Sequence, residues 1–168
     1  MKNVLIILSS LITVGCIIPY IRDVLKKKTK PRVVSWFTWS LLSGIAGAAS
    51  LADHQYAAAA LSLSATIECM IVVILGLKYG DREFTKFDIS CQVGALVGLL
   101  LWFLLDSPAI AVTVAVAIDF IGTLPTVKHA WQKPGEETPI TFFLAGFAAL
   151  LTVFAATSVQ VTALANPL

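Results

Sequence analysis

The fold is decided by the stretch Gly15-Cys-Ile-Ile-Pro19-Tyr-Ile-Arg22-Asp23, which has a second copy in Gly122-Thr-Leu-Pro125-Thr-Val-Lys128-His129. In each copy an apolar segment holds a proline near its end and a polar turn follows. A second apolar segment then opens on a hydroxyl residue and aromatics, at Ser35 in the first copy and at Thr141 in the second. The prolines lie 106 positions apart (125 minus 19), and the same offset places Ser35 on Thr141 without a gap. The sequence therefore predicts a duplicated helical module.

The composition predicts a protein that is dissolved in lipid. Of the 168 residues, 58% are hydrophobic and 13% are charged, and the mean hydropathy is +0.87. A soluble domain carries about 25% charged residues, so this chain cannot cover its surface with polar groups in water. The net charge of +2 and the lack of a glycine-rich phosphate loop argue against nucleic-acid and nucleotide binding. We therefore expect the lipid bilayer to be its environment.

The cysteines and the remaining polar residues point to no enzymatic or metal chemistry. Cys16, Cys69 and Cys91 each lie inside an apolar stretch and have no metal-ligand spacing, so we expect small packing residues. The chain has no nucleophile elbow, metal-ligand cluster or catalytic carboxylate pair in its sequence. We therefore expect neither an enzyme nor a bound metal or cofactor.

Six apolar stretches are long enough to cross a membrane. A spanning helix needs about 20 residues, and its backbone polar groups must be hydrogen-bonded within the segment. The predicted spans are Val4–Ile21, Val33–Ala52, Tyr56–Leu77, Phe87–Leu105, Pro108–Val127 and Pro139–Thr157. The fold class predicted is thus an all-α polytopic membrane protein with six transmembrane helices.

The charges of the connecting segments predict an orientation. The first, third and fifth connections hold 11 of the 12 lysines and arginines, and only Lys2 lies on the other side. Basic residues remain in the cytoplasm, so we expect a multi-pass protein of the inner membrane with its N-terminus outside. We interpret the lysines at 26–30 as a determinant of topology, and we expect Asp23 and His129 to be solvated at the inner surface.

This pattern resembles the PQ-loop superfamily, which includes the SWEET and SemiSWEET sugar transporters and the Pnu-type vitamin transporters. The resemblance is carried by Pro19 and Pro125 near the inner helix ends, by the basic loops and by a linker helix at Phe87–Leu105. The motif Lys30-Pro31-Arg-Val-Val-Ser35-Trp36-Phe37-Thr38-Trp39, together with Asp119-Phe-Ile-Gly122-Thr-Leu-Pro125-Thr126, looks like bacterial membrane proteins of this type. Tyr20 and Thr126 stand where the Pro-Gln signature has glutamine.

The resemblance implies a 3+1+2 arrangement. Residues 1–80 would form a three-helix bundle, 81–107 a linker helix, and 108–168 a second, incomplete bundle of two helices and a short tail. A seventh helix is lacking relative to the family. Either the chain is truncated, or a partner subunit or a second copy in a homo-oligomer completes the second bundle.

The function implied is that of a carrier. Its substrate would be a small polar organic solute such as a sugar, moved by alternating access with or without proton coupling. Pro19 and Pro125 would be gating hinges, although a static kink explains a membrane proline equally well. The alternative is a membrane receptor or assembly factor that uses the same scaffold without transporting a solute.

Two carboxylates within the predicted spans are candidates for the solute site. A charged carboxylate at the bilayer centre costs about 2.5–3.5 kcal/mol, which favours a position facing the bundle interior or a water-filled cavity. Asp119 has Thr123 one helical turn away, and Glu68 has Ser64 one turn before it. Each carboxylate is either a solute or proton site or a structural hydrogen-bonding group.

Aromatic and hydroxyl residues of the second span complete the predicted site. Trp36 and Ser43 fall on one helix face, and Trp39 is displaced from it and sits deeper in the membrane. A tryptophan beside hydroxyls can stack on a sugar ring and bind its hydroxyl groups. We interpret Trp36 as part of an interfacial aromatic belt and place Trp39 and Ser43 in the cavity.

Overall fold

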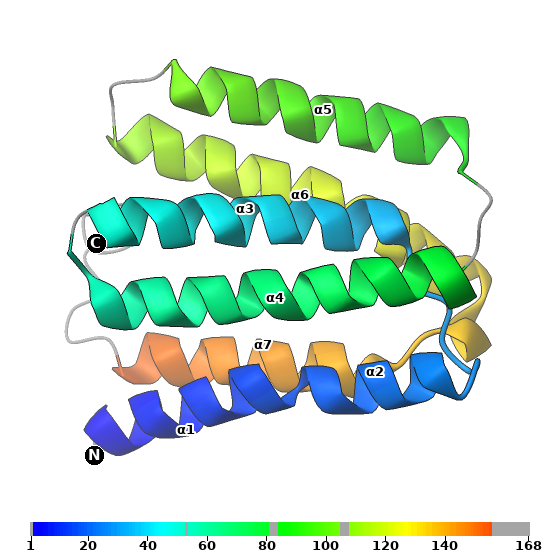
Figure 1. Ribbon diagram of the computed structural model, residues 1–168, viewed down its shortest axis with the longest axis horizontal. Coiled ribbons are helices and arrows are strands. Elements are labelled where there is room, and N and C mark those ends of the chain that lie inside the picture. The colour runs from blue at the N-terminus through cyan, green and yellow to red at the C-terminus, as the bar shows by residue number, and fades with distance from the viewer. Residues whose placement is uncertain (1, 53, 81–83, 105–107, 156–168) are drawn as a thin grey trace.

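The computed structural model describes residues 2–52, 54–80, 84–104 and 108–155, and all regular elements in these ranges are helices. They are α1 (Lys2–Gly15), α2 (Ile17–Leu25), α3 (Val33–Ala52), α4 (Tyr56–Tyr79), α5 (Lys86–Phe103), α6 (Pro108–Gln132), the 3₁₀ helix η1 (Pro134–Glu136) and α7 (Pro139–Ala155). Because α2 continues the line of α1 (Figure 1), the described residues form six long rods. The predicted all-α fold is confirmed. The predicted span ends at Leu105 and Thr157 and the tail Ser158–Leu168 lie outside the described residues.

Three of the described helical stretches are long and apolar enough to cross a membrane. They are Val4–Leu25, Val33–Ala52 and Tyr56–Tyr79, and a shorter apolar stretch covers Pro139–Phe154. Large apolar side chains cover the outside of the molecule, where for example Leu100 is 65% exposed. Monomeric soluble proteins do not expose continuous apolar surfaces of this extent, so the surface suits contact with lipid chains.

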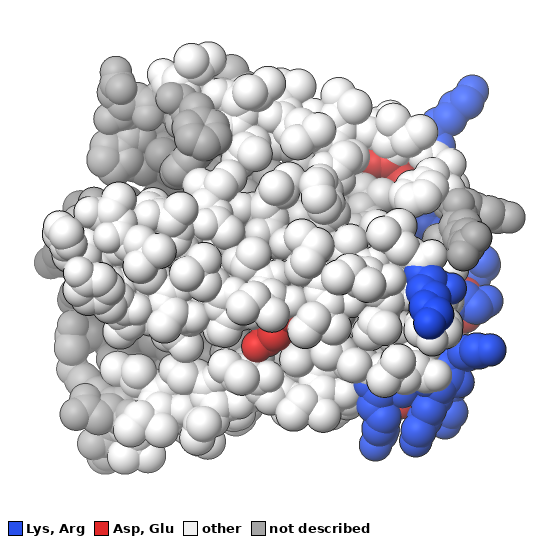
Figure 2. Space-filling model, in the orientation of Figure 1, with Lys and Arg blue, Asp and Glu red and all other residues white. Residues whose placement is uncertain are grey.

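The basic connections lie together at one end of the helices. The α2–α3 and α6–α7 connections lie at that end, together with the end of α4 and the start of α5, whereas the end of α3 and the start of α4 lie at the opposite end (Figure 1). In the space-filling view the lysines and arginines gather at the same end, while the apolar body carries few charges (Figure 2). The structure thus groups the basic segments as the charge pattern predicts.

Several helices extend past the ends of the predicted spans at this basic end. Helix α2 ends at Leu25 rather than Ile21, α4 at Tyr79 rather than Leu77, and α6 at Gln132 rather than Val127. Hydropathy marks where the chain leaves the hydrocarbon, whereas the backbone hydrogen bonds of a helix continue into a polar environment. The basic connections are therefore shorter than the sequence predicts.

The two repeated prolines lie in different surroundings. Pro19 has no N–H to donate to the carbonyl of Gly15, and the helix is interrupted at Cys16, between α1 and α2. Pro125 lies inside the uninterrupted helix α6 and its side chain is fully buried. The break between α1 and α2 is thus a missing backbone hydrogen bond within one rod, because Cys16 keeps helical dihedral angles (φ −66°, ψ −20°), and the two prolines differ chiefly in burial.

The helix packing repeats with the sequence. The offset of 106 residues carries Val33, where α3 begins, onto Pro139, where α7 begins, and maps the α1–α2 rod onto α6. Helix α1 packs against α7, and α3 packs against α6. When each helix is replaced by its equivalent in the other copy, the α1–α7 contact becomes the α6–α3 contact. This is the relation expected of two modules related by a pseudo-two-fold axis. The same offset carries the start of α4 beyond residue 155, outside the described residues.

The contact between α3 and α6 depends on a glycine. A Cβ atom added at Gly122 would lie 2.7 Å from the Cγ2 atom of Thr38. Small residues allow membrane helices to approach closely. Gly122 thus sets the spacing between the two copies on this side of the molecule.

Candidate functional site

The two copies meet at a pair of equivalent residues. The Lys30 ammonium lies 2.6 Å from Oε1 of Glu136, and the Lys30 backbone N–H donates to the Glu136 carbonyl over 2.9 Å. The two residues are separated by 106 positions, which is the offset of the repeat. Equivalent positions can touch each other only close to the axis that relates the copies. The α2–α3 and α6–α7 connections therefore face each other across this axis, at the basic end.

Buried hydroxyl groups reinforce this junction. The hydroxyls of Thr29 and Thr138 are hydrogen-bonded to each other, and Thr138 also lies 3.3 Å from Oδ2 of Asp23. Thr29 is 1% exposed and Thr138 is 3% exposed. Asp23 also pairs with the exposed Arg22, over 3.3 Å. Asp23 thus belongs in part to the junction, and the prediction that it is simply solvated is wrong.

An aromatic cluster lies next to this junction. Tyr20 is fully buried, its ring centre is 4.8 Å from that of Trp36 and 6.0 Å from that of Phe142, and Trp36 contacts Trp39 edge-on at 5.0 Å. The indole N–H of Trp36 donates to the Tyr20 hydroxyl over 3.2 Å. Trp36 and Phe142 are equivalent in the repeat. Trp36 is only 4% exposed, so its predicted place in an interfacial belt is wrong: it packs inside the cluster against Tyr20 of α2 and Trp39 of α3.

Glu137 connects the aromatic cluster to the polar junction. The Tyr20 hydroxyl donates to Oε2 of Glu137 over 3.2 Å. Burial raises the pKa of Glu137 to about 7, although the hydrogen bond from Tyr20 acts in the opposite direction. The neighbouring Glu136 has its pKa lowered, chiefly by the hydrogen bond from Lys30. Two consecutive carboxylates therefore have opposite pKa shifts, and Glu137 is the one that titrates near neutral pH.

Two of the predicted solute-site residues come together from different copies. Trp39 on α3 is half-buried, and its indole is close enough to act as a hydrogen-bond donor to Asp119 on α6. The Trp39 ring centre also lies 6.5 Å from that of Phe142 on α7. Asp119 is exposed on the surface of the single chain. Trp39 and Asp119 thus form a polar and aromatic pair between α3 and α6.

The predicted hydroxyl residues make mostly local hydrogen bonds. Ser43 donates to the Trp39 carbonyl over 2.8 Å, and it lies 3.1 Å from the hydroxyl of Thr66 on α4. Ser64 and Thr123 each donate to a carbonyl of their own helix over 2.8 Å, those of Leu61 and Asp119 respectively. Ser43 therefore lies next to Trp39, whereas the proton of Ser64 is engaged within α4.

Glu68 occupies a different place from the Trp39–Asp119 pair. It is half-buried on α4 and acts electrostatically on Cys16, at the break between α1 and α2, and on Cys69. Among the described residues, no hydrogen bond or ion pair joins Glu68 to Trp39 or Asp119. Glu68 and Asp119 therefore do not form one cluster.

Sequence reasoning missed a buried ion pair at the start of the linker helix. Arg32 pairs with Asp88, and their side chains are 7% and 3% exposed. Asp88 also accepts from the backbone N–H and the hydroxyl of Thr85, both over 2.8 Å, and its own N–H lies 3.2 Å from that hydroxyl. This reciprocal arrangement is a capping box at the N-terminus of α5. The spacing Thr85-x-x-Asp88 was the sequence signal for it.

His129 is also buried rather than solvated. It is 5% exposed, and its Nε2 atom lies 3.5 Å from Oε2 of Glu136. The prediction of a solvated loop residue is wrong because α6 continues past Val127 and places His129 against the junction. Polar groups from both copies thus close the basic end of the molecule.

Comparisons with family models, with curated proteins and with solved structures find no match to this chain. In the described part of the chain no three histidine, cysteine, aspartate or glutamate residues come together in a group able to hold a metal ion.

Proposed function

We propose that this chain is an inner-membrane carrier for a small polar organic solute such as a sugar, on a scaffold of the PQ-loop type. Its N-terminus would lie outside and its basic connections in the cytoplasm. The observation that supports a carrier best is the contact between Lys30 and Glu136, because equivalent residues of two modules meet there. Transporters of this kind hold their solute between repeated modules that rock against each other.

The described conformation suits a carrier that is closed at its cytoplasmic end. The bonds between Lys30 and Glu136, Thr29 and Thr138, and Tyr20 and Glu137 all join the two copies at that end. A solute leaving toward the cytoplasm would require these bonds to break. We propose that Pro19 and Pro125, each of which leaves one backbone hydrogen bond of its rod unmade, let the inner ends of α2 and α6 bend as hinges.

The solute would bind beside the Trp39–Asp119 pair. An indole face provides the flat apolar surface on which a sugar or heterocyclic ring stacks, and a carboxylate binds hydroxyl groups or a proton. Asp119 and Glu68 are the two candidates for proton coupling, and their separate positions suggest separate roles. In this proposal Asp119 contacts the solute, whereas Glu68 responds to movement at the Cys16 break.

Solute counterflow into proteoliposomes tests this function. The purified protein is loaded with a mixture of unlabelled sugars, nucleosides, vitamins and amino acids, and uptake of each labelled solute is followed. We expect one class to exchange, with a strong loss in Trp39→Ala and little change in the matched control Phe143→Ala, whose ring is 69% exposed. Uptake that ignores a proton gradient and survives Asp119→Asn and Glu68→Gln would exclude coupling. Exchange of no solute class would contradict a carrier.

A receptor or assembly factor on the same scaffold is the second candidate. The apolar side chains exposed on α6 and α7, such as Phe120 and Phe143, would also accept a membrane helix of a partner protein. Purification from membranes with a stoichiometric partner, combined with no counterflow, would support this function over transport.

A further inference from the structure

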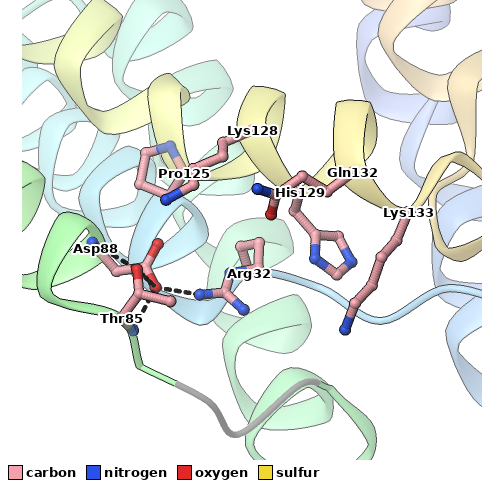
Figure 3. Close-up of a pocket in the computed structure, with 8 residues that line it drawn as sticks. All are labelled: Arg32, Thr85, Asp88, Pro125, Lys128, His129, Gln132 and Lys133. Carbon is pink, nitrogen blue, oxygen red and sulfur yellow. Dashed lines mark hydrogen bonds and ion pairs between the residues drawn. The ribbon is translucent and has the colours of Figure 1, made fainter.

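A basic pocket opens between the start of α5 and the end of α6, beside the junction of the two copies. Its volume is about 90 Å³, and it is lined by Arg32, Asp88, Lys128, His129 and Lys133 together with neutral residues. In Figure 3 Arg32 lies between Asp88 on one side and His129 and Lys133 on the other. The wall therefore carries more positive than negative groups.

Among the described residues, each acidic group near this pocket acts on a basic one, and the buried Glu137 acts together with Asp88 on Arg32. Asp88 is bonded to Arg32 and to Thr85, and Glu136, just outside the lining, pairs with Lys30. Glu136 also lies 3.9 Å from the ammonium of Lys133. These contacts balance Arg32 and part of the charge of Lys133. They leave Lys128 as the strongest source of positive potential.

Lys128 is positioned over an aromatic ring. Its ammonium lies 4.4 Å from the ring centre of Phe87 on α5, and among the described residues it forms no ion pair. A cation–π contact holds an ammonium in place without neutralising its charge. Lys128 can thus attract an anion into the pocket.

An apolar groove continues from the same residue. Phe87, Leu124, Val127 and Trp131 line this groove, which shares Lys128 and Gln132 with the basic pocket. Trp131 is 87% exposed and Val127 is 53% exposed. A tryptophan at the end of a membrane helix is typical of the headgroup level of a bilayer. The molecule thus presents a basic pocket and an apolar groove side by side, at the end that carries the basic connections.

We propose that the pocket and the groove together bind one anionic phospholipid of the inner leaflet. Its phosphate would lie in the basic pocket next to Lys128, and an acyl chain would lie along the groove beside Trp131. Basic pockets between membrane helices on the cytoplasmic side suit such headgroups. The groove makes a lipid a better occupant than a free phosphate, which would leave it empty. The inference relies on the membrane placement given under the proposed function, but not on transport.

The test compares melting temperatures in lipid nanodiscs that contain phosphatidylcholine alone or phosphatidylcholine with phosphatidylglycerol. We expect phosphatidylglycerol to raise the melting temperature of the wild type. Lys128→Gln should lose this increment, whereas Lys28→Gln should keep it. Both substitutions remove one charge at the basic end, so a general attraction to an anionic surface would be weakened equally. Equal loss in the two variants would overturn the site.

Two further measurements distinguish a bound lipid from a free phosphate. Both use the wild type, so they also test the proposal if Lys128→Gln does not fold. Native mass spectrometry of the wild type, released from mixed-lipid nanodiscs, should retain one phosphatidylglycerol molecule in preference to phosphatidylcholine, and Trp131→Ala should weaken this retention. Equal retention of both lipids would overturn the proposal. Stabilisation in detergent by inorganic phosphate, to the same extent as by phosphatidylglycerol, would also overturn it.

Discussion

The Tyr20 hydroxyl donates a hydrogen bond to Oε2 of Glu137 over 3.2 Å, although 117 positions separate the two residues. Tyr20 belongs to α2 in the first copy, and Glu137 belongs to the connection before α7 in the second. The bond therefore lies directly between the two copies, at the basic end of the molecule.

Glu137 is expected to make stability depend on pH. Its pKa is raised from 4.5 to about 7, so between these values the folded protein holds a proton that the unfolded chain releases. The free energy of unfolding should fall as the pH rises through this window, by on the order of 2 kcal/mol. The groups acting on Glu137 are Tyr20, Arg32, Glu136 and the backbone of Thr138. Melting temperatures in detergent between pH 4.5 and 8 measure the effect.

Two variants test whether Glu137 causes this pH dependence of stability. Glu137→Gln keeps an acceptor for Tyr20 and cannot titrate, so its curve should be flatter. Tyr20→Phe removes the hydrogen bond that lowers the pKa of Glu137, so the fall should move to higher pH. If Glu137→Gln retained the slope of the wild type, another group would be responsible.

The Lys30–Glu136 ion pair should tolerate an exchange of its two charged residues. Lys30→Glu and Glu136→Lys should each destabilise the protein, and the double variant should recover most of the loss because the two residues occupy equivalent places. The Lys30 and Glu136 side chains are 41% and 25% exposed, so a coupling of about 0.2–1 kcal/mol is expected in a double-mutant cycle. Strictly additive effects would show that the two residues do not meet.

Breaking the Arg32–Asp88 pair should be more costly. Both side chains are buried, and Asp88 also caps α5, so Asp88→Asn removes the buried carboxylate that is ion-paired with the Arg32 guanidinium. We expect a loss of about 3–5 kcal/mol, measured by chemical unfolding in detergent micelles. A loss below about 1 kcal/mol, the size typical of exposed pairs, would contradict the burial of this pair.

The approach of α3 to α6 is tested at Gly122. Gly122→Ala places a methyl group against Cγ2 of Thr38 and should cost about 1–3 kcal/mol. Thr38→Ser removes that methyl group, so the double variant should recover stability. The control is Gly146→Ala on α7, where nothing lies within 4 Å and the gain in helix propensity should be neutral or stabilising. Equal losses at the two glycines would argue against a close contact at Gly122.

The positions of the helices could be predicted from the sequence to a large extent. The span Val33–Ala52 agrees with α3 at both ends, because its limits are set by a proline-containing basic turn on one side and a polar turn on the other. The grouping of the basic connections followed from counting lysines and arginines. Hydropathy and charge are properties of neighbouring residues along the chain, so a single sequence reveals them directly.

The contacts of the site could not be predicted in this way. Trp36 looks like an interfacial residue because a basic loop precedes it, but it is buried and its ring packs against those of Tyr20 and Trp39. Asp23 looks solvated for the same reason, although it meets Thr138 from a distant segment, and His129 is buried against Glu136 of the turn that follows its own helix. The offset of 106 aligns Lys30 with Glu136, yet their opposite charges conceal the equivalence. Only the packing of the two copies shows that these residues touch.

The most direct test of a carrier made of two opposed modules is solute counterflow with positions 30 and 136 joined. Lys30→Cys and Glu136→Cys are introduced together after Cys16, Cys69 and Cys91 have been replaced, and flux is measured in proteoliposomes before oxidation, after oxidation and after reduction. We expect oxidation to form a disulfide that holds the cytoplasmic end closed and stops solute exchange. Reduction of this disulfide should restore the exchange. Exchange that continues at full rate in the oxidised, cross-linked protein would contradict the account.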